Sequence, residues 1–132
     1  MNLRLQTIGL ITLAVTASPL HASEAEIIDV QFTRTGKTWT VRTMLQHGDT
    51  GWDHYADAWR VVDSDDNVLA TRVITRPHVE DQPFARSLRN VNIPRQTHIV
   101  FIEAHDTGSG WSKRRVKVDL KRKDGPRYRV SR

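Results

Sequence analysis

The sequence predicts an all-β domain, a seven-stranded antiparallel β-sandwich of the immunoglobulin or fibronectin type III kind. Apolar and polar residues alternate in seven short stretches, which is the pattern of half-buried strands. No stretch shows the period of an amphipathic helix, and turn residues separate the stretches. A tryptophan in the third stretch, Trp59, and the absence of cysteine fit the fibronectin-like version of the fold. A small open barrel is the alternative.

The first three predicted strands follow one another through short polar segments. In residues 25–34 the side chains of Ile28, Val30 and Phe32 lie on one face, with polar residues between them. Thr35–Lys37 then supplies a turn. The next two strands alternate in the same way and cover residues 37–47 and 57–63.

The remaining four strands are separated by a hairpin turn, a long loop with two prolines, a short proline turn and a glycine loop. Ser64–Asn67 is the hairpin turn, because Asp and Asn side chains bond to nearby backbone groups and so favour turns. The four strands cover residues 68–75, 86–93, 97–105 and 114–120.

Residues 1–22 have the layout of a secretory signal peptide. A basic residue precedes an apolar run at 8–17, which is too short to span a bilayer, and small residues lead to a predicted cleavage after Ala22. An N-terminal membrane anchor is the alternative. We therefore expect a periplasmic or secreted protein, with a sandwich domain at 23–120 and a basic C-terminal tail at 121–132.

Charge is distributed unevenly along the chain. Residues 23–112 hold 9 basic and 13 acidic side chains, a net charge of −4, whereas residues 113–132 hold 10 basic and 2 acidic, a net charge of +8. The basic end is expected to be a solvated, mobile tail or a weak contact to an anionic surface, such as phospholipid head groups or acidic polysaccharide. Nucleic acid is not an expected partner of an exported protein, and we expect a monomer.

Strand order predicts that three long loops meet. In an antiparallel chain successive loops alternate between the two ends of the sandwich, so the loops at 46–57, 75–85 and 105–111 share one end. We call this the three-loop end. Two of its loops echo each other as HGDTGW and HDTGSGW. Loops at one end of a rigid sandwich commonly carry binding function.

Histidines and carboxylates gather at the three-loop end, which predicts a divalent metal site. Imidazole nitrogens and carboxylate oxygens are ligands for zinc and copper. The predicted ligands are three histidines, one from each loop, with a fourth ligand from another histidine or an aspartate. They are His47, His78 and His105, with His54 or Asp49 as the fourth.

Two other interpretations of the same loops stay open. The histidines and aspartates also fit a purely structural network that satisfies the backbone of long loops. Alternatively, loop aromatics anchor a periplasmic protein or a glycan, which makes the domain an accessory binding module. The candidate binding residues are Trp52, Asp53, Tyr55, Asp57, Asp106 and Trp111. An enzyme is not predicted, because the chain has no cysteine nucleophile and no Gly-x-Ser-x-Gly motif.

The runs HGDTGWDHYADAWRVVD, RPHVEDQPFARSL and AHDTGSGW resemble a family of small exported proteobacterial proteins. That family carries a His-x-Asp-Thr-Gly-Trp-(Asp/Glu)-His-Tyr-Ala-Asp motif and has no assigned activity. The resemblance covers most of 28–112. It implies export and draws attention to the loop residues, but a shared fold does not by itself imply a function.

Overall fold

The computed structural model describes residues 9, 11 and 23–132. Apart from two isolated positions, the predicted signal peptide lies outside the described residues. The described part contains ten strands and no helix, so the all-β prediction is confirmed. The strands are β1 (Glu26–Thr35), β2 (Thr38–Gln46), β3 (Ala56–Asp63), β4 (Val68–Val73), β5 (Phe84–Val91), β6 (Ile99–Asp106), β7 (Gly110–Trp111), β8 (Val116–Asp119), β9 (Asp124–Gly125) and β10 (Tyr128–Ser131).

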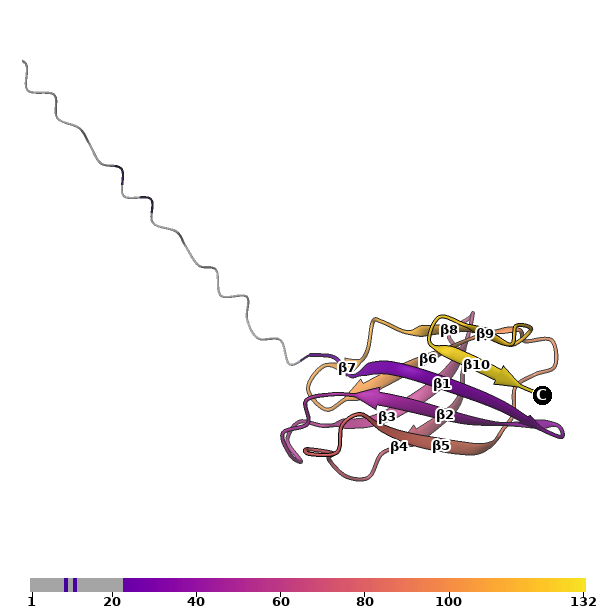
Figure 1. Ribbon diagram of the computed structural model, residues 1–132, viewed down its shortest axis with the longest axis horizontal. Coiled ribbons are helices and arrows are strands. Elements are labelled where there is room, and N and C mark those ends of the chain that lie inside the picture. The colour runs from indigo at the N-terminus through magenta and orange to yellow at the C-terminus, as the bar shows by residue number, and fades with distance from the viewer. Residues whose placement is uncertain (1–8, 10, 12–22) are drawn as a thin grey trace, which may run out of the picture.

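The strands form two sheets that pack as a sandwich (Figure 1). One sheet has the order β5-β2-β1-β10-β9, and the other has the order β4-β3-β6-β7, with β8 also pairing with β6. The seven predicted strands correspond to β1–β6 and β8. The prediction missed β7 and β9, which have two residues each, and β10, whose four residues stand among arginines.

The predicted basic tail is wrong for its last residues, which belong to the sandwich. Strand β10 pairs with β1 in parallel, with Val30 opposite Tyr128 and Phe32 opposite Val130. The side chains of Tyr128 and Val130 are buried in the core. The alternation in β10 is hidden among arginines, which is why the sequence favoured a mobile tail. The pairing also means that the sandwich is not wholly antiparallel.

The core lies between the two sheets, and the strand faces are largely as predicted. Trp59 is fully buried, as expected for a sandwich of this size. In β1 the structure buries Ile27 rather than the predicted Ile28, because a register shift between Ile27 and Asp29 turns the start of the strand over. The largest fully buried hydrophobic side chains are Trp59, Phe32, Leu45, Ile74, Ile102, Val30, Val41, Val61, Val62, Val100 and Val118.

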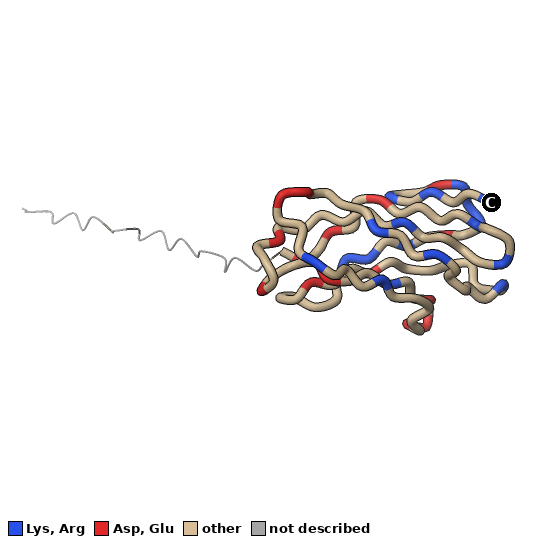
Figure 2. Tube along the Cα trace, turned by 90° about the horizontal axis from the view of Figure 1, so that it is seen from below, with Lys and Arg blue, Asp and Glu red and all other residues tan. Residues whose placement is uncertain are grey.

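The predicted three-loop end exists. Strand pairing places Gln46 opposite Glu26, Leu45 opposite Phe84, and Ala56 opposite Asp106. The ends of β2 and β6 and the starts of β3 and β5 therefore lie at one end of the sandwich, where the described chain begins (Figure 1). Acidic residues gather at this end, and basic residues predominate toward the C-terminus (Figure 2).

Candidate metal centre

Hydrogen bonds from backbone and side chains join the loops at the three-loop end. Gln82 bridges two of them, because its Oε1 accepts from the backbone N–H of His47 at 3.0 Å and its Nε2 donates to the carbonyl of His78 at 2.9 Å. Thr107 connects the third loop, since its hydroxyl accepts from the N–H of Tyr55 at 3.1 Å and its N–H donates to the carbonyl of Tyr55 at 3.0 Å. The loops therefore form one unit rather than three independent segments.

Asp49 is the central acceptor of this unit. Its Oδ1 accepts from Nδ1 of His47 at 2.6 Å and from the N–H of Ala56 at 2.9 Å, and its Oδ2 accepts from the N–H of His78 at 2.7 Å. Asp49 is buried, and both of its oxygens have protein donors. Asp49 was predicted as a possible metal ligand, but in the structure its hydrogen bonds position His47 and the loop around His78.

Three side chains from two loops converge beside Asp49. Among the described residues one group of histidine, aspartate and glutamate side chains has metal-ligand spacing: His47, His54 and Asp106, whose candidate ligand atoms all lie within 4.8 Å of one another. The rings of His47 and His54 meet edge to face, with centroids 4.7 Å apart. Nε2 of His54 lies 3.1 Å from Oδ1 of Asp106. Asp106 was predicted as a binding residue but not as a ligand.

The loop after β6 fixes the Asp106 carboxylate. Its Oδ1 accepts from the backbone N–H groups of Gly108 at 3.0 Å and Ser109 at 2.7 Å. Burial alone would raise the pKa of Asp106, but the hydrogen bonds from Ser109, His54 and Gly108 outweigh it, and the pKa lies below its usual value of 3.8. Asp106 is therefore an anion at neutral pH, as a metal ligand needs to be.

Two buried polar atoms in this cluster have no hydrogen-bond partner within the described part of the chain. They are Nε2 of His47 and Oδ2 of Asp106. The side chains of both residues have no exposed surface. A buried polar atom without a partner costs roughly 1–3 kcal/mol, so proteins rarely keep one without a use. Here two such atoms, a nitrogen and an oxygen, belong to the same three-residue cluster.

The pairing with Asp49 also determines which nitrogen of His47 is free. An ionised carboxylate only accepts hydrogen bonds, so the proton of neutral His47 sits on Nδ1, next to Asp49. Its Nε2 then carries a lone pair. Metal-binding histidines are typically held in this way, with the second ring nitrogen donating to a carboxylate.

His78 does not join the cluster, which corrects the predicted ligand set. Its Nδ1 pairs with Asp81 at 2.7 Å, and its Nε2 accepts from Nη2 of Arg86 at 3.1 Å. The ring is fully buried and stacks on Phe84, with centroids 3.8 Å apart. Both ring nitrogens are thus used inside the protein, and the residue anchors its loop.

Asp81 provides a pH-dependent contact in that loop. The hydrogen bond from His78 is the largest cause that holds the pKa of Asp81 below 3.8, and the charge of Arg76 contributes less. The contact is therefore complete above pH 3.8 and is lost as the pH falls through the lowered pKa. We expect a ¹³C carboxyl titration by NMR to show a larger upward shift of this pKa in His78→Phe than in Arg76→Ala. An equal shift in the two variants would contradict this assignment.

His105 also lies outside the cluster, on the outer face of its sheet. Its Nδ1 hydrogen-bonds to Asp57, and its ring meets Trp111 edge to face at 4.8 Å. Trp111 in turn lies under Arg60, whose guanidinium carbon is 3.8 Å from the ring centroid. Strand alternation explains the separation, because His105 and Asp106 are neighbours in β6 and their side chains point to opposite faces. The structure therefore does not bring the predicted ligands His47, His78 and His105 together.

The other predicted binding residues are at the rim. Trp52 is 69% exposed, and its ring meets Tyr55 edge to face at 5.7 Å. Asp53 is exposed, and its backbone carbonyl accepts from the hydroxyl of Thr107. Trp111 is half-buried, and the guanidinium of Arg60 packs on its ring.

Sequence reasoning missed Gln82, Thr107 and Gly108. Gln82 follows an unremarkable loop segment, and nothing in its spacing shows that it bridges two loops. The echo of Asp-Thr-Gly in both loops was the available indication for Thr107 and Gly108. Gly108 packs so closely that a Cβ there would lie 2.8 Å from Nε2 of His54, which explains the need for glycine.

Within the described residues, no helix has the length and hydropathy required to cross a membrane. No protein-family model and no solved structure matches the chain. The chain is similar to a protein from Halomicrobium mukohataei named "Putative lipoprotein", with 31% identity over 103 residues. The match covers 77% of this chain and 50% of the relative, so the chain spans about half the length of the relative it matches.

Proposed function

We propose that the protein is an exported, non-catalytic β-sandwich module that holds one divalent transition-metal ion with His47, His54 and Asp106. The observation that carries this proposal is the pair of buried, unpartnered atoms, Nε2 of His47 and Oδ2 of Asp106, within a group of metal-ligand spacing. A metal ion would satisfy both atoms at once, whereas a purely structural network would leave both unsatisfied.

The donor set favours zinc or copper(II). Two imidazoles and one carboxylate are a common three-ligand set for zinc, with a fourth position open, and the same donors suit copper(II). Ligand atoms about 2.0–2.2 Å from one tetrahedral ion lie about 3.3–3.6 Å apart. The candidate ligand atoms lie within 4.8 Å of one another, so they need to approach by up to about 1.5 Å. The same three residue types also hold non-haem iron(II) in other proteins, so iron belongs in the test.

Burial around the cluster supports a holding role rather than catalysis. The side chains of His47 and Asp106 have no exposed surface, and that of His54 is 19% exposed. Solvent therefore reaches the cluster only beside His54, which leaves little room for an organic substrate at the ion.

Export is supported by the signal-peptide layout of 1–22 and by the name of the Halomicrobium mukohataei relative, "Putative lipoprotein". We infer a location in the periplasm or outside the cell, and membership in the exported family that the loop motif resembles. Without the short strands β7, β9 and β10, the sheets are β5-β2-β1 and β4-β3-β6-β8, an arrangement that supports a fibronectin type III-like sandwich with an added C-terminal hairpin.

The proposal is tested by titrating zinc, copper(II) and iron(II) into EDTA-treated protein spanning 23–132. We expect one equivalent of zinc or copper to bind with a Kd of about 1 μM or tighter, and His54→Ala to weaken binding about 100-fold. His54 is partly exposed, so this variant should stay folded. His98→Ala is the matched control, because His98 is exposed at the other end of the sandwich. If metal binds only with a millimolar Kd, or if His54→Ala and His98→Ala lose the same affinity, the proposal is contradicted and the cluster is a purely structural network.

A substitution at Gly108 tests the same metal site in a second way. In Gly108→Ala the added methyl would meet Nε2 of His54 at 2.8 Å and Cδ2 at 2.9 Å, so the imidazole has to turn away. We expect metal affinity to fall about tenfold. Gly48→Ala serves as the control, because a Cβ there has no neighbour within 4 Å. Unchanged affinity in Gly108→Ala would exclude His54 as a ligand.

One observation favours a second function, binding of a protein or glycan at the rim. Trp52 lies in the loop that carries His47 and His54, yet 69% of its surface is exposed, and an exposed tryptophan is a common anchor in interfaces. This function predicts that Trp52→Ala abolishes capture of a partner from periplasmic extract while metal affinity stays unchanged. Equal capture by the wild-type protein and the variant would exclude it.

A further inference from the structure

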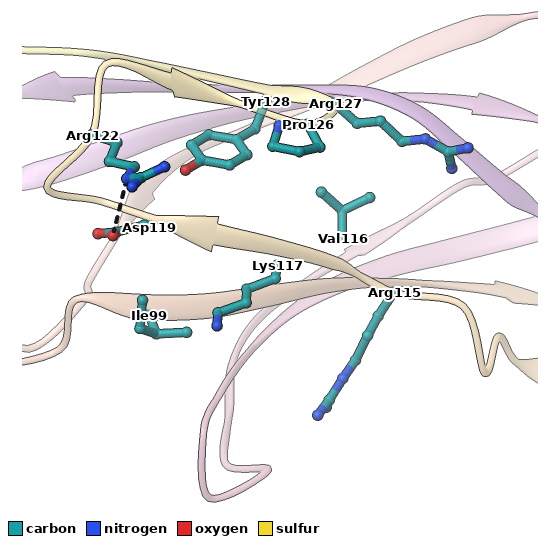
Figure 3. A pocket seen from close by; sticks show the side chains of 9 residues that line it. All are labelled: Ile99, Arg115, Val116, Lys117, Asp119, Arg122, Pro126, Arg127 and Tyr128. Carbon is teal, nitrogen blue, oxygen red and sulfur yellow. Dashed lines mark ion pairs between the residues drawn. The ribbon is translucent and has the colours of Figure 1, made fainter.

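A groove runs along one open edge of the sandwich, between β8 and the β9–β10 hairpin (Figure 3). Its volume is about 570 Å³. Basic side chains outnumber acidic ones along it, with Asp119 as the single carboxylate among the lining residues. The lining cations are Arg115, Lys117, Arg122 and Arg127.

Two of these cations are already held by the protein. Arg115 pairs with Asp66 at 3.0 Å and stacks over Phe101, and Figure 3 shows it pointing out of the groove. Arg127 donates to the carbonyl of Ile27 at 3.2 Å and lies 3.7 Å from Glu26. These two arginines contribute positive potential, but their hydrogen bonds are largely used.

The other two cations are free to bind. The Lys117 side chain makes no hydrogen bond or ion pair with the described residues, and the Arg122 side chain makes only a weak ion pair with Asp119 among them, at 3.9 Å. Both line the groove: Arg122 lies beside Asp119 on the hairpin side of β8, and Lys117 lies on the other side of that strand, where Arg115 also points (Figure 3). An anion that spans the edge of β8 would meet two charged donors.

Between the charged ends the groove is apolar. Pro126 is exposed in its middle, beside Val116 and Tyr128, which are only 7% and 5% exposed (Figure 3). Gly125 lets the ring lie close to the backbone, because a Cβ at Gly125 would be 2.6 Å from the hydroxyl of Tyr128. An elongated groove with an apolar middle and cations at both ends suits a chain that has apolar faces and carries regularly spaced negative charges.

We propose that this groove binds a linear anionic glycan, a chain of sugars that bear carboxylates. Pyranose rings offer apolar C–H faces to Pro126, which is exposed, and their carboxylates match the charges of Lys117 and Arg122. A flat membrane surface fits a concave groove poorly. The net charge of +8 in residues 113–132 would attract such a chain from a distance.

The groove is separate from the metal cluster. Ile99, which lines the groove, begins β6, and Asp106 ends the same strand. Seven residues of strand span about 23 Å. The proposed glycan site therefore does not depend on the proposed metal site, and each can be tested separately.

The test is a calorimetric titration of oligogalacturonate into the protein spanning 23–132. The groove variant is Lys117→Gln/Arg122→Gln, and the control is Arg42→Gln/Arg89→Gln, which removes the same charge from exposed positions on β2 and β5. We expect the groove variant to weaken binding about tenfold or more, and the control to change it less than about twofold. A neutral dextran oligomer should not bind.

Three results would overturn the proposal: equal weakening in both variants, equal binding of the neutral oligomer, or binding of anionic phospholipid vesicles as tightly as of oligogalacturonate. The first would mean that only net charge matters. The third would assign the basic edge to a membrane surface. All four substituted residues are exposed, and circular dichroism verifies that both variants stay folded.

Discussion

Asp49→Ala is expected to destabilise the fold by about 3–5 kcal/mol. The substitution removes the acceptor for three buried donors, Nδ1–H of His47 and the backbone N–H groups of Ala56 and His78. These donors belong to two of the three loops and to the start of β3, so the substitution should destabilise the whole three-loop end. Urea unfolding followed by tryptophan fluorescence measures the change.

Asp53→Ala is the matched control for Asp49→Ala. Asp53 lies in the same loop but is exposed, so its loss should change stability by no more than about 0.5 kcal/mol. If Asp49→Ala is as mild as Asp53→Ala, then Asp49 does not organise the loops as described.

Removal of residues 121–132 is expected to cost at least about 4 kcal/mol, because it deletes the buried side chains of Tyr128 and Val130 and the ladder between β10 and β1. Small domains are stabilised by only about 5–15 kcal/mol, so the shortened chain should lose a large fraction of its stability and unfold at a clearly lower temperature. Thermal unfolding monitored by circular dichroism gives the answer.

The charge of this segment can be separated from its strands. Lys121→Gln/Lys123→Gln removes two exposed charges but keeps β9 and β10, and its stability should match the wild-type protein within about 0.5 kcal/mol. If the shortened chain is as stable as this variant, residues 121–132 do not stabilise the sandwich, and the predicted mobile tail is correct.

The sequence was sufficient for the layers and for the position of the three-loop end. Alternation marks strands whatever their partners are, and antiparallel order alone decides at which end a loop falls. For this reason Gln46, Phe84 and Asp106 could be placed at one end without coordinates. Strand β10 could not, because four residues carry too little pattern and its parallel partner β1 lies about 100 residues earlier in the chain.

The metal ligands could not be predicted from the sequence alone. Counting histidines predicted His47, His78 and His105, but coordination depends on which ring nitrogen is already in use. Arg86 and Asp81 occupy both nitrogens of His78, and alternation turns His105 away from Asp106. His54 and Asp106 take their places because the loop around Thr107 folds onto Tyr55. Such contacts depend on loop conformation, which residue types alone do not determine.

The central claim, that His47, His54 and Asp106 hold a metal ion, is tested most directly by long-range ¹H–¹⁵N NMR of the histidine rings. Zinc is added to EDTA-treated protein while the ring nitrogens of every histidine are followed. We predict that the resonances of Nε2 of His47 and one ring nitrogen of His54 move on addition of one equivalent, while those of His78 and His105 stay in place. Unchanged His47 and His54 resonances, or movement of His78 and His105 instead, would contradict the account.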